Sequence, residues 1–244
     1  MTPAHLADRI RDCRPCVVLT GAGVSTESGI PDFRSREGIW ASYDPLEVAS
    51  LDGFRRDPVR VWEFYARRLA VHAKAEPNAA HHALARLEEL GLVEAIVTQN
   101  VDGLHQRAGS RNVVEVHGSI RGAVCPGCRA RATAERVLAS LPLPTCDCGE
   151  ILKPGVVLFG EILPATELES ATKLARRARL LLAVGSTLEV YPVAALPLET
   201  LRAGGSFAIV NRGPTALDAE AELRLEGNAA TILREILAEL ENRR

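Results

Sequence analysis

The sequence predicts an α/β protein built on a doubly wound, mostly parallel sheet, with a smaller second lobe. A buried strand at 17–19 runs directly into Gly21-Ala-Gly23, which is how nucleotide-binding α/β units begin. Further apolar runs alternate with helical patterns along the chain, as in parallel sheets covered by helices. Two segments, 34–76 and 119–154, break this alternation, so we expect them to leave the sheet and return to it.

The elements follow from local pattern. The first is a helix, because Thr2 can cap it, Pro3 suits its first turn, and Leu6 and Ile10 share one side. Buried strands are expected at 17–19, 95–98, 113–116, 156–159, 180–184 and 207–210. Helical patterns cover 78–90, 166–178 and 228–240.

We assign 1–33, 77–118 and 155–244 to the large domain, and the helical insertion 34–76 with 119–154 to the small domain.

Composition and charge exclude several classes of protein. A chain of 244 residues is ordinary for one large core with an appended lobe. Its 29 Lys and Arg nearly balance 31 Asp and Glu, so the basic excess of a nucleic-acid binder is missing. No apolar run approaches a membrane span of about 18 residues, and the first residues lack the apolar core of a signal peptide. We expect a cytoplasmic protein whose cysteines are reduced or metal-bound.

Four cysteines lie in two close pairs, Cys125-Pro-Gly-Cys128 and Cys146-Asp-Cys148. Two pairs of thiolates in a segment with little hydrophobic pattern are typical of a structural zinc site, because ligation replaces a core. The second pair has one intervening residue instead of the usual two, and a redox role is the alternative. Four cysteines leave no open ligand position, so this zinc is expected to be structural.

A third cysteine pair, Cys13-Arg-Pro-Cys16, resembles a redox C-x-x-C motif. It precedes a strand, whereas a thiol with a low pKa is usually placed at a helix N-terminus. We therefore favour a structural role for this pair.

The glycine loop departs from the dinucleotide fingerprint, because Thr26 stands where the third glycine is expected. Its place after a buried strand favours phosphate binding by free backbone N–H groups. A conventional dehydrogenase also needs an acid at the end of a second strand about 20 residues on. Asp44 is near that distance but is not on a strand, so hydride transfer is disfavoured.

Separate blocks along nearly the whole chain resemble the sirtuin family, in the family's order. They are Gly21-Ala-Gly-Val-Ser25, Gly29-Ile-Pro-Asp-Phe-Arg34, Thr98-Gln-Asn-Val-Asp102, His117-Gly118, the four cysteines of the proposed zinc site, Val157-Leu-Phe-Gly-Glu161, Gly185-Ser-Thr187 and Val210-Asn211. The resemblance implies a Rossmann-like NAD-binding domain, a zinc-bearing small lobe and an NAD-dependent protein-lysine deacylase. In such enzymes the acyl-lysine oxygen attacks the ribose carbon that carries nicotinamide, nicotinamide leaves, and the acyl group ends on ADP-ribose.

The resemblance also implies the catalytic residues. His117 matches the histidine that acts as general base on a ribose hydroxyl, and imidazole titrates in the range this needs. Asn100 and Asp102 resemble the pair that orients the ribose and grips the nicotinamide amide. For Asp102, and for Asp32 in the cofactor loop, turn or capping chemistry is the alternative.

Further residues are implied to bind NAD. Ala22, Gly23 and Ser25 should face its phosphates, Phe33 should shield the ribose carbon, and Gln99 should bond to the ribose. The full set is Gly21, Ala22, Gly23, Ser25, Thr26, Ile30, Asp32, Phe33, Arg34, Trp40, Gln99, Asn100, Asp102, Gly185, Ser186, Thr187, Asn211 and Ala229.

The acyl-lysine substrate is expected to bind between the lobes as an added strand, against Gly160-Glu161 and Val190-Tyr191. Val157 and Phe159 should line an apolar acyl-lysine tunnel, with plain strand core as the alternative.

The preferred acyl group is open at this point. Tyr65-x-x-Arg68 matches the pair of sirtuins that remove succinyl and malonyl groups, since a guanidinium and a phenol can receive a carboxylate. Those members have a small alanine where Arg36 stands here. A solvated helix surface is the alternative for Arg68.

Two other functions are weighed against the deacylase. One is mono-ADP-ribosyl transfer with the same cofactor, and the other is a non-catalytic binding module that uses NAD or zinc. Intact His117 and Asn100 argue against the second.

Overall fold

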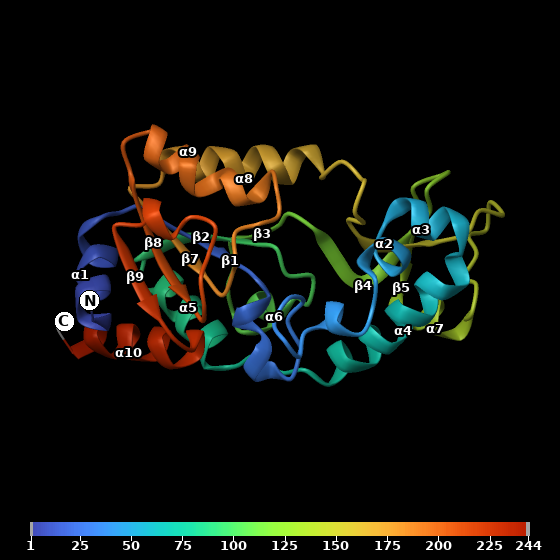
Figure 1. Ribbon diagram of the computed structural model, residues 1–244, viewed down its shortest axis with the longest axis horizontal. Helices are drawn as coiled ribbons and strands as arrows, with labels where there is room; N and C mark the ends of the chain where they lie inside the picture. Colours follow the sequence, from blue (N-terminus) through green and yellow to red (C-terminus); the bar gives the residue numbers. More distant parts are fainter. Residues whose placement is uncertain (1, 243–244) are drawn as a thin grey trace.

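The computed structural model describes residues 2–242 and has a larger and a smaller part, joined end to end along the long axis (Figure 1). The larger part holds a six-stranded sheet, and both ends of the described chain lie at its far end. The smaller part holds a three-stranded sheet and a group of helices. The sequence-based prediction of an α/β protein with a second lobe is confirmed, while the exact domain boundaries remain a prediction.

The large sheet is parallel throughout, with strand order β3-β2-β1-β7-β8-β9. Its strands are β1 (Cys16–Thr20), β2 (Val93–Thr98), β3 (Val113–Glu115), β7 (Leu180–Val184), β8 (Ser206–Asn211) and β9 (Leu223–Glu226). The order reverses direction at β1, which places a crevice beyond the carboxyl ends of β1 and β7.

Helices cover both surfaces of this sheet (Figure 1). One layer consists of α1 (Pro3–Asp12), α5 (Ala79–Glu89) and α10 (Ala229–Asn242), whose apolar side chains form one core with alternate strand residues. The opposite layer consists of α8 (Ala165–Arg177) and α9 (Leu196–Arg202). Because β1 is buried on both surfaces, Val18 packs into the first core and Val17 into the second.

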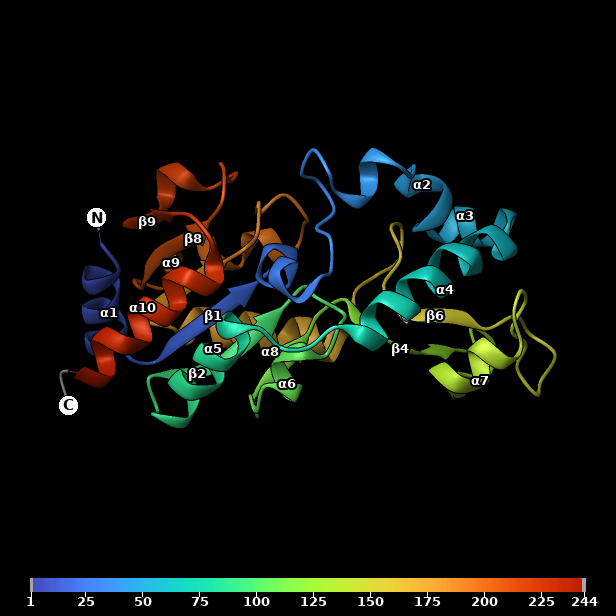
Figure 2. The same ribbon diagram turned by 90° about the horizontal axis from the view of Figure 1, so that it is seen from below.

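The small part contains the antiparallel sheet β5-β4-β6, made of β4 (Gly118–Val124), β5 (Arg131–Thr133) and β6 (Lys153–Val156). Its helices are α2 (Pro45–Val48), α3 (Leu51–Arg56), α4 (Pro58–Lys74) and α7 (Ala134–Ala139). The two insertions share one core, and the indole N–H of Trp62 in α4 donates to the backbone oxygen of Leu152 at 2.7 Å. A short connection then joins α4 to α5 in the large part (Figure 2).

Three expectations about strands differ from the structure. The apolar run 156–159 is not a strand of the parallel sheet, because β6 ends at Val156 in the small sheet and extended chain follows. The edge strand β9 was missed because its half-exposed residues alternate in polarity. Strands β4 and β5 were missed because they lie in a segment with few apolar residues.

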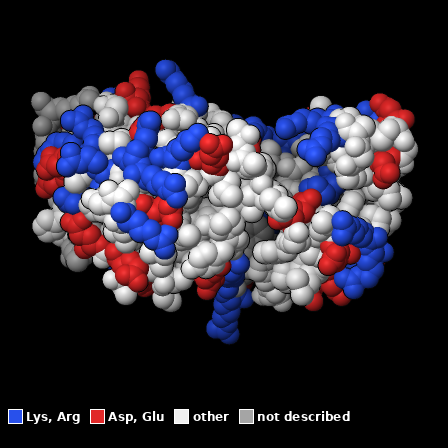
Figure 3. Space-filling model, turned by 90° about the horizontal axis from the view of Figure 1, so that it is seen from above, with Lys and Arg blue, Asp and Glu red and all other residues white. Residues whose placement is uncertain are grey.

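The surface carries mixed charge. On the side seen in Figure 3, Lys and Arg alternate with Asp and Glu over the larger part, and the outline is indented between the two parts. Within residues 2–242, no helix is both long and apolar enough to cross a membrane.

Candidate active site

A cavity of about 1180 Å³ lies between the two parts of the molecule. Its walls include residues that directly follow β1, β2, β7 and β8, which is where open α/β sheets bind ligands. Most of the predicted site residues line it: Gly21, Ala22, Gly23, Thr26, Asp32, Phe33, Arg34, Trp40, Tyr65, Arg68, Gln99, Asn100, His117, Val157, Phe159, Gly160, Glu161, Gly185, Ser186, Thr187, Val190, Tyr191, Asn211 and Ala229. Ser25, Ile30 and Asp102 are buried just behind this wall.

The glycines after β1 allow the turn that follows β1 to pack closely against the turn that follows β7. A Cβ on Gly21 would come within 2.7 Å of the Gly185 oxygen, and a Cβ on Gly23 within 2.8 Å of the Gly185 Cα. Their N–H groups donate to the oxygens of Val184 and Gly185, at 3.1 and 2.9 Å. The expectation of free backbone N–H groups at this turn therefore does not hold for Gly21 and Gly23, and close backbone approach is what requires glycine at both positions.

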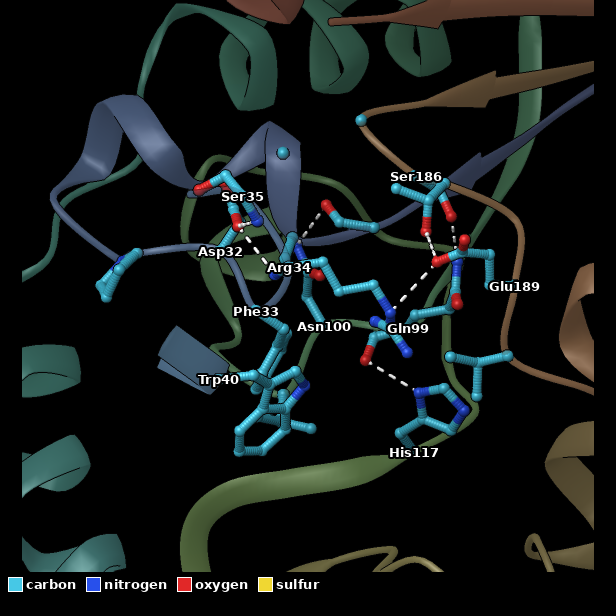
Figure 4. Close-up of a pocket in the computed structure, with 18 of the residues that line it drawn as sticks. Asp32, Phe33, Arg34, Ser35, Trp40, Gln99, Asn100, His117, Ser186 and Glu189 are labelled. Carbon is cyan, nitrogen blue, oxygen red and sulfur yellow. Dashed lines mark hydrogen bonds and ion pairs between the residues drawn. The ribbon is translucent and has the colours of Figure 1, made fainter. Parts of the chain in front are cut away.

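His117 lies at the floor of the cavity with its ring held by the backbone (Figure 4). Its Nδ1 is 3.1 Å from the Gln99 oxygen, so Nδ1 carries the proton and Nε2 presents a lone pair. Burial lowers the pKa of His117, and the hydrogen bond to Gln99 opposes that shift. The imidazole is therefore neutral near pH 7 and can accept a proton at Nε2.

A buried polar network fixes Asn100. Its amide nitrogen donates to the Gly21 oxygen at 3.0 Å and to the Ser25 hydroxyl at 3.1 Å. Ser25 in turn donates to Asp102 at 2.7 Å, and the other oxygen of Asp102 accepts the Leu104 N–H that begins α6 (Leu104–Arg107). The helix-capping alternative for Asp102 therefore describes one of its two bonds, while the second bond connects it to the cavity wall.

The loop after the first glycines closes one side of the cavity (Figure 4). Asp32 accepts the backbone N–H groups of Arg34 and Ser35, at 3.0 and 2.8 Å, which is the capping chemistry considered as its alternative role. The Phe33 ring packs on Trp40 with centroids 5.1 Å apart. Across the cavity, Arg34 forms an ion pair of 3.1 Å with Glu189.

The segment after β6 forms the opposite wall. Val157 donates to the His117 oxygen at 2.9 Å, and Phe159 pairs in parallel with Ser50. Glu161 accepts the Leu158 N–H at 2.8 Å and the Lys153 ammonium at 3.0 Å. This segment is thus fixed to the general-base candidate at one end and to the small sheet at the other.

Tyr65 and Arg68 both face the same cavity from α4. The Arg68 guanidinium lies over the Phe33 ring at 5.0 Å and near the Phe64 ring at 5.7 Å. No carboxylate pairs with it in the described part of the chain, and its hydrogen bond is a long one to His72. Burial lowers the pKa of Arg68 and raises that of Tyr65. Arg68 is therefore not on a solvated helix surface, as its alternative reading held.

Arg36 is exposed at the cavity wall, and no ion pair of it occurs within residues 2–242.

The four cysteines of the small part converge as expected, with all Sγ atoms within 4.8 Å of one another. The Cys125–Cys148 and Cys128–Cys146 sulfur pairs are both 3.5 Å apart. A tetrahedron with Zn–S bonds of about 2.3 Å has edges of about 3.8 Å, so the donors fit a Cys₄ zinc site. The fifth and sixth cysteines, Cys13 just before β1 and Cys16 at its start, are buried and form no disulfide.

Sequence reasoning missed several lining residues. Gly227 and Asn228 follow the unpredicted strand β9, and the rule that sites follow parallel strands would have found them. Glu189 and Arg212 lie two and one positions beyond motif residues. Glu189 is brought into the site by its ion pair with Arg34, which is distant in the sequence.

A family model described as the Sir2 family matches residues 21–192 of this chain, which includes the glycine loop, His117 and all four clustered cysteines. The chain belongs to the Sir2 family of sirtuins. The resemblance drawn from separate sequence blocks is thereby confirmed, and Sir2 architecture accounts for the two unequal parts and the cavity between them.

Similar Sir2 proteins agree over nearly the whole chain. NAD-dependent protein deacylase 1 of Archaeoglobus fulgidus is 43% identical over 233 residues, covering 95% of each chain. A solved Sir2 complex with p53 peptide and NAD⁺ has a TM-score of 0.89 at 40% identity, covering 98% of each chain. A Sir2 variant with deacetylated p53 peptide and 3′-O-acetyl ADP-ribose has a TM-score of 0.93 at 41% identity, again covering 98% of each chain.

Proposed function

We propose that this sirtuin is an NAD-dependent protein-lysine deacylase that transfers the acyl group of a lysine side chain to ADP-ribose and releases nicotinamide. The observation that carries this proposal is the position of His117. Its neutral ring lies in one cavity with the glycine turn and Asn100 on one side and the segment after β6 on the other. Relatives named for this activity, and solved Sir2 complexes that contain NAD, peptide or the acetylated ADP-ribose product, support it.

Different residues of the cavity are suited to bind NAD, to accept a proton and to exclude water. When bound, NAD supplies a ribose carbon whose bond to nicotinamide can break as the acyl oxygen adds. Asn100, fixed by Gly21 and Ser25, is suited to hold the nicotinamide end, and Ser186 and Asn211 lie where the adenosine half would bind. His117 then accepts the proton of a ribose hydroxyl at Nε2. Phe33 lies over the cavity and can exclude water from the sugar.

The peptide is proposed to bind as an added strand between Gly160-Glu161 and Val190-Tyr191. The backbone N–H groups of Gly160 and Val190 have no acceptor in the described part of the chain, so they are available to a peptide backbone. Backbone recognition would give affinity with a modest demand on sequence. The acyl-lysine would then pass Val157 and Phe159 toward His117.

The direct test is nicotinamide release with acetyl-, succinyl- and longer acyl-lysine peptides. A deacylase releases nicotinamide only with an acylated peptide and forms acyl-ADP-ribose. Label from NAD that stays on protein would instead indicate mono-ADP-ribosyl transfer. No nicotinamide release from any substrate would leave a non-catalytic module.

The pH dependence should report the state of His117. A general base must be neutral, and burial lowers the pKa of His117 below its usual value of about 6.5. Activity should therefore be flat near pH 7 and fall only as the pH drops below about 6.5, where the ring takes up a proton. The measurement is kcat/KM against pH with acetyl-lysine peptide. An acid limb centred above pH 7 would contradict this assignment.

We further propose that acidic acyl groups are accepted beside acetyl groups. The support is Arg68, a partly buried guanidinium in the cavity wall with no carboxylate partner within residues 2–242. Arg68→Ala should lower kcat/KM for succinyl-lysine by about ten- to hundredfold, because a charge-assisted hydrogen bond contributes about 1.5 to 3 kcal/mol. The acetyl-lysine value should change little, because a neutral acetyl group gives the guanidinium no charge to bind.

Two further variants separate charge from packing. Arg68→Met keeps a long apolar stem against Phe33 and should show the same selective loss. Arg67→Met changes the exposed neighbour, which bonds to Tyr43, and should leave the ratio of the two substrates unchanged. An unaltered ratio in both Arg68 variants would leave a plain deacetylase.

We also propose a cytoplasmic location and the two-domain division given above. The six cysteines are all free of disulfides, as expected in a reducing compartment. The separate cores of the two sheets support the division.

A further inference from the structure

A chain of buried hydrogen bonds runs beneath the cavity floor. His105 Nε2 is 3.0 Å from the Thr20 hydroxyl, Thr20 donates to the Thr98 hydroxyl at 2.8 Å, and Thr98 accepts the backbone N–H of Asn100 at 3.0 Å. The side chains of His105, Thr20 and Thr98 are all at most 2% exposed. We name these three residues the hydroxyl chain.

The direction of the bonds follows from proton counting. A hydroxyl has one proton, and Thr20 uses its proton on Thr98, so the bond to His105 must be donated by Nε2–H. His105 Nδ1 then has no proton and no partner among the described residues. Burial lowers the pKa of His105 to about 3, so the ring stays neutral and this direction is fixed at working pH.

The hydroxyl chain ends on the segment that holds the general base. Thr20 and Thr98 are the last residues of β1 and β2. The backbone oxygen of Thr20 also accepts the Gln99 N–H at 3.0 Å, while the backbone oxygen of Gln99 is the partner of His117 Nδ1. The Thr98–Gln99 peptide is thus held by the Thr20 backbone oxygen, and the Gln99–Asn100 peptide by the Thr98 hydroxyl. The carbonyl of the Gln99–Asn100 peptide in turn orients the His117 ring.

Packing alone does not require these hydroxyls. The rest of β1 is Cys16-Val-Val-Leu19, and a valine at the position of Thr20 would fill nearly the same volume. Buried polar groups reduce stability unless they are hydrogen-bonded. Two hydroxyls at neighbouring strand ends, with a histidine behind them, therefore indicate that oriented hydrogen bonds are needed here to fix the position of the backbone.

We propose that Thr20, supported by His105 and Thr98, is a positioning residue for the acyl-transfer step. It sets the place of the Gln99–Asn100 peptide and, through the Gln99 oxygen, the orientation of the His117 ring. This inference rests on the proposed deacylase function. A displacement of about 1 Å in a reacting group can cost on the order of a hundredfold in rate, so a small shift here is measurable.

The test compares three variants with wild type under saturating NAD and peptide. Thr20→Val removes the hydroxyl and keeps the branched shape, which leaves His105 Nε2–H and the Thr98 oxygen without their partner. Thr20→Ser keeps the hydroxyl. Thr200→Val is the matched control, because Thr200 is fully buried in α9 and donates to the Ala175 oxygen, outside the cavity wall.

We expect Thr20→Val to lose about ten- to a hundredfold in kcat, with a smaller change in the KM of NAD. The acid limb of kcat/KM should move to lower pH, because a weaker bond to Gln99 removes the interaction that raises the pKa of His117. Thr20→Ser should restore both quantities most of the way. Thr200→Val should lower the melting temperature and leave kcat and the pH profile unchanged.

Wild-type kcat and an unshifted pH profile in Thr20→Val would overturn the proposal, and so would a Thr20→Ser variant as slow as Thr20→Val. If Thr20→Val does not fold, the deciding variant is His105→Phe. It removes the donor to Thr20, keeps an aromatic ring against His81, and should still lower kcat. An unchanged kcat in His105→Phe then overturns the proposal. A wild-type protein that releases no nicotinamide contradicts the proposed deacylase function instead.

Discussion

Replacing His117 with alanine is expected to reduce acyl transfer to ADP-ribose by about 10²- to 10⁴-fold, the usual effect of removing a general base. The fold should survive, because the only hydrogen bond its ring makes in the described chain is to the Gln99 oxygen. NAD should still bind, because the glycine turn, Asn100 and Ser186 keep their own partners. Single-turnover formation of acyl-ADP-ribose at saturating NAD measures the loss.

The matched control is His82→Ala, which removes an exposed histidine of α5 and should leave turnover unchanged. Binding of ADP-ribose and the melting temperature should be close to wild type in both variants. Near wild-type turnover in His117→Ala would mean that His117 is a structural residue and that the base lies elsewhere.

The parallel sheet could be predicted because its central strands are buried on both surfaces. The run 180–184 matches β7 (Leu180–Val184), and 207–210 lies within β8, since continuous apolar residues are typical of such strands. The run 156–159 has the same composition but serves a different purpose. Its residues are apolar because they form the cavity wall and the small core, and periodicity alone does not distinguish these two environments.

The candidate site could be predicted residue by residue where motifs carried it, and the structure brings most of those residues to one cavity. What the sequence did not indicate are partnerships between distant segments. Arg34 and Glu189 form their ion pair from two loops far apart in the chain. The hydrogen bonds of the hydroxyl chain could not be predicted either, because nothing in the sequence indicates that Thr20 and Thr98 are neighbours until β1 and β2 are paired.

The zinc site and the substrate wall are physically continuous. The second cysteine pair is followed by Leu152, which accepts the Trp62 indole bond, and then by β6. Val157 follows β6 directly and donates to the His117 oxygen, and Glu161 further along the same segment bonds to Lys153 of β6. The short strand β6 therefore connects the metal site directly to the cavity wall that should hold the acyl-lysine, and disorder at the cysteines should disturb that wall.

Loss of the metal site should consequently unfold the small part. The purified chain should carry about one zinc, and Cys125→Ser or Cys146→Ser should lose it, together with solubility and activity. Structural zinc sites contribute about 10 to 16 kcal/mol in small peptides, as much as the whole stability of about 5 to 15 kcal/mol of an ordinary domain. The strands that flank the cysteines have few apolar residues of their own, so the metal should contribute a large share of the stability of the small part beside the core around Trp62.

Tryptophan fluorescence makes this prediction specific to the small part. The chain has 2 tryptophans, Trp40 and Trp62, and both pack in the core of the small part. Zinc loss in Cys125→Ser should shift the emission to the red, while the parallel sheet keeps its circular dichroism. Cys13→Ser, a change at a buried cysteine outside the cluster, should retain zinc and native emission. A zinc-free protein with full activity and unshifted emission would show that the four thiols hold no structural metal, and that the small part is stabilised by its apolar core alone.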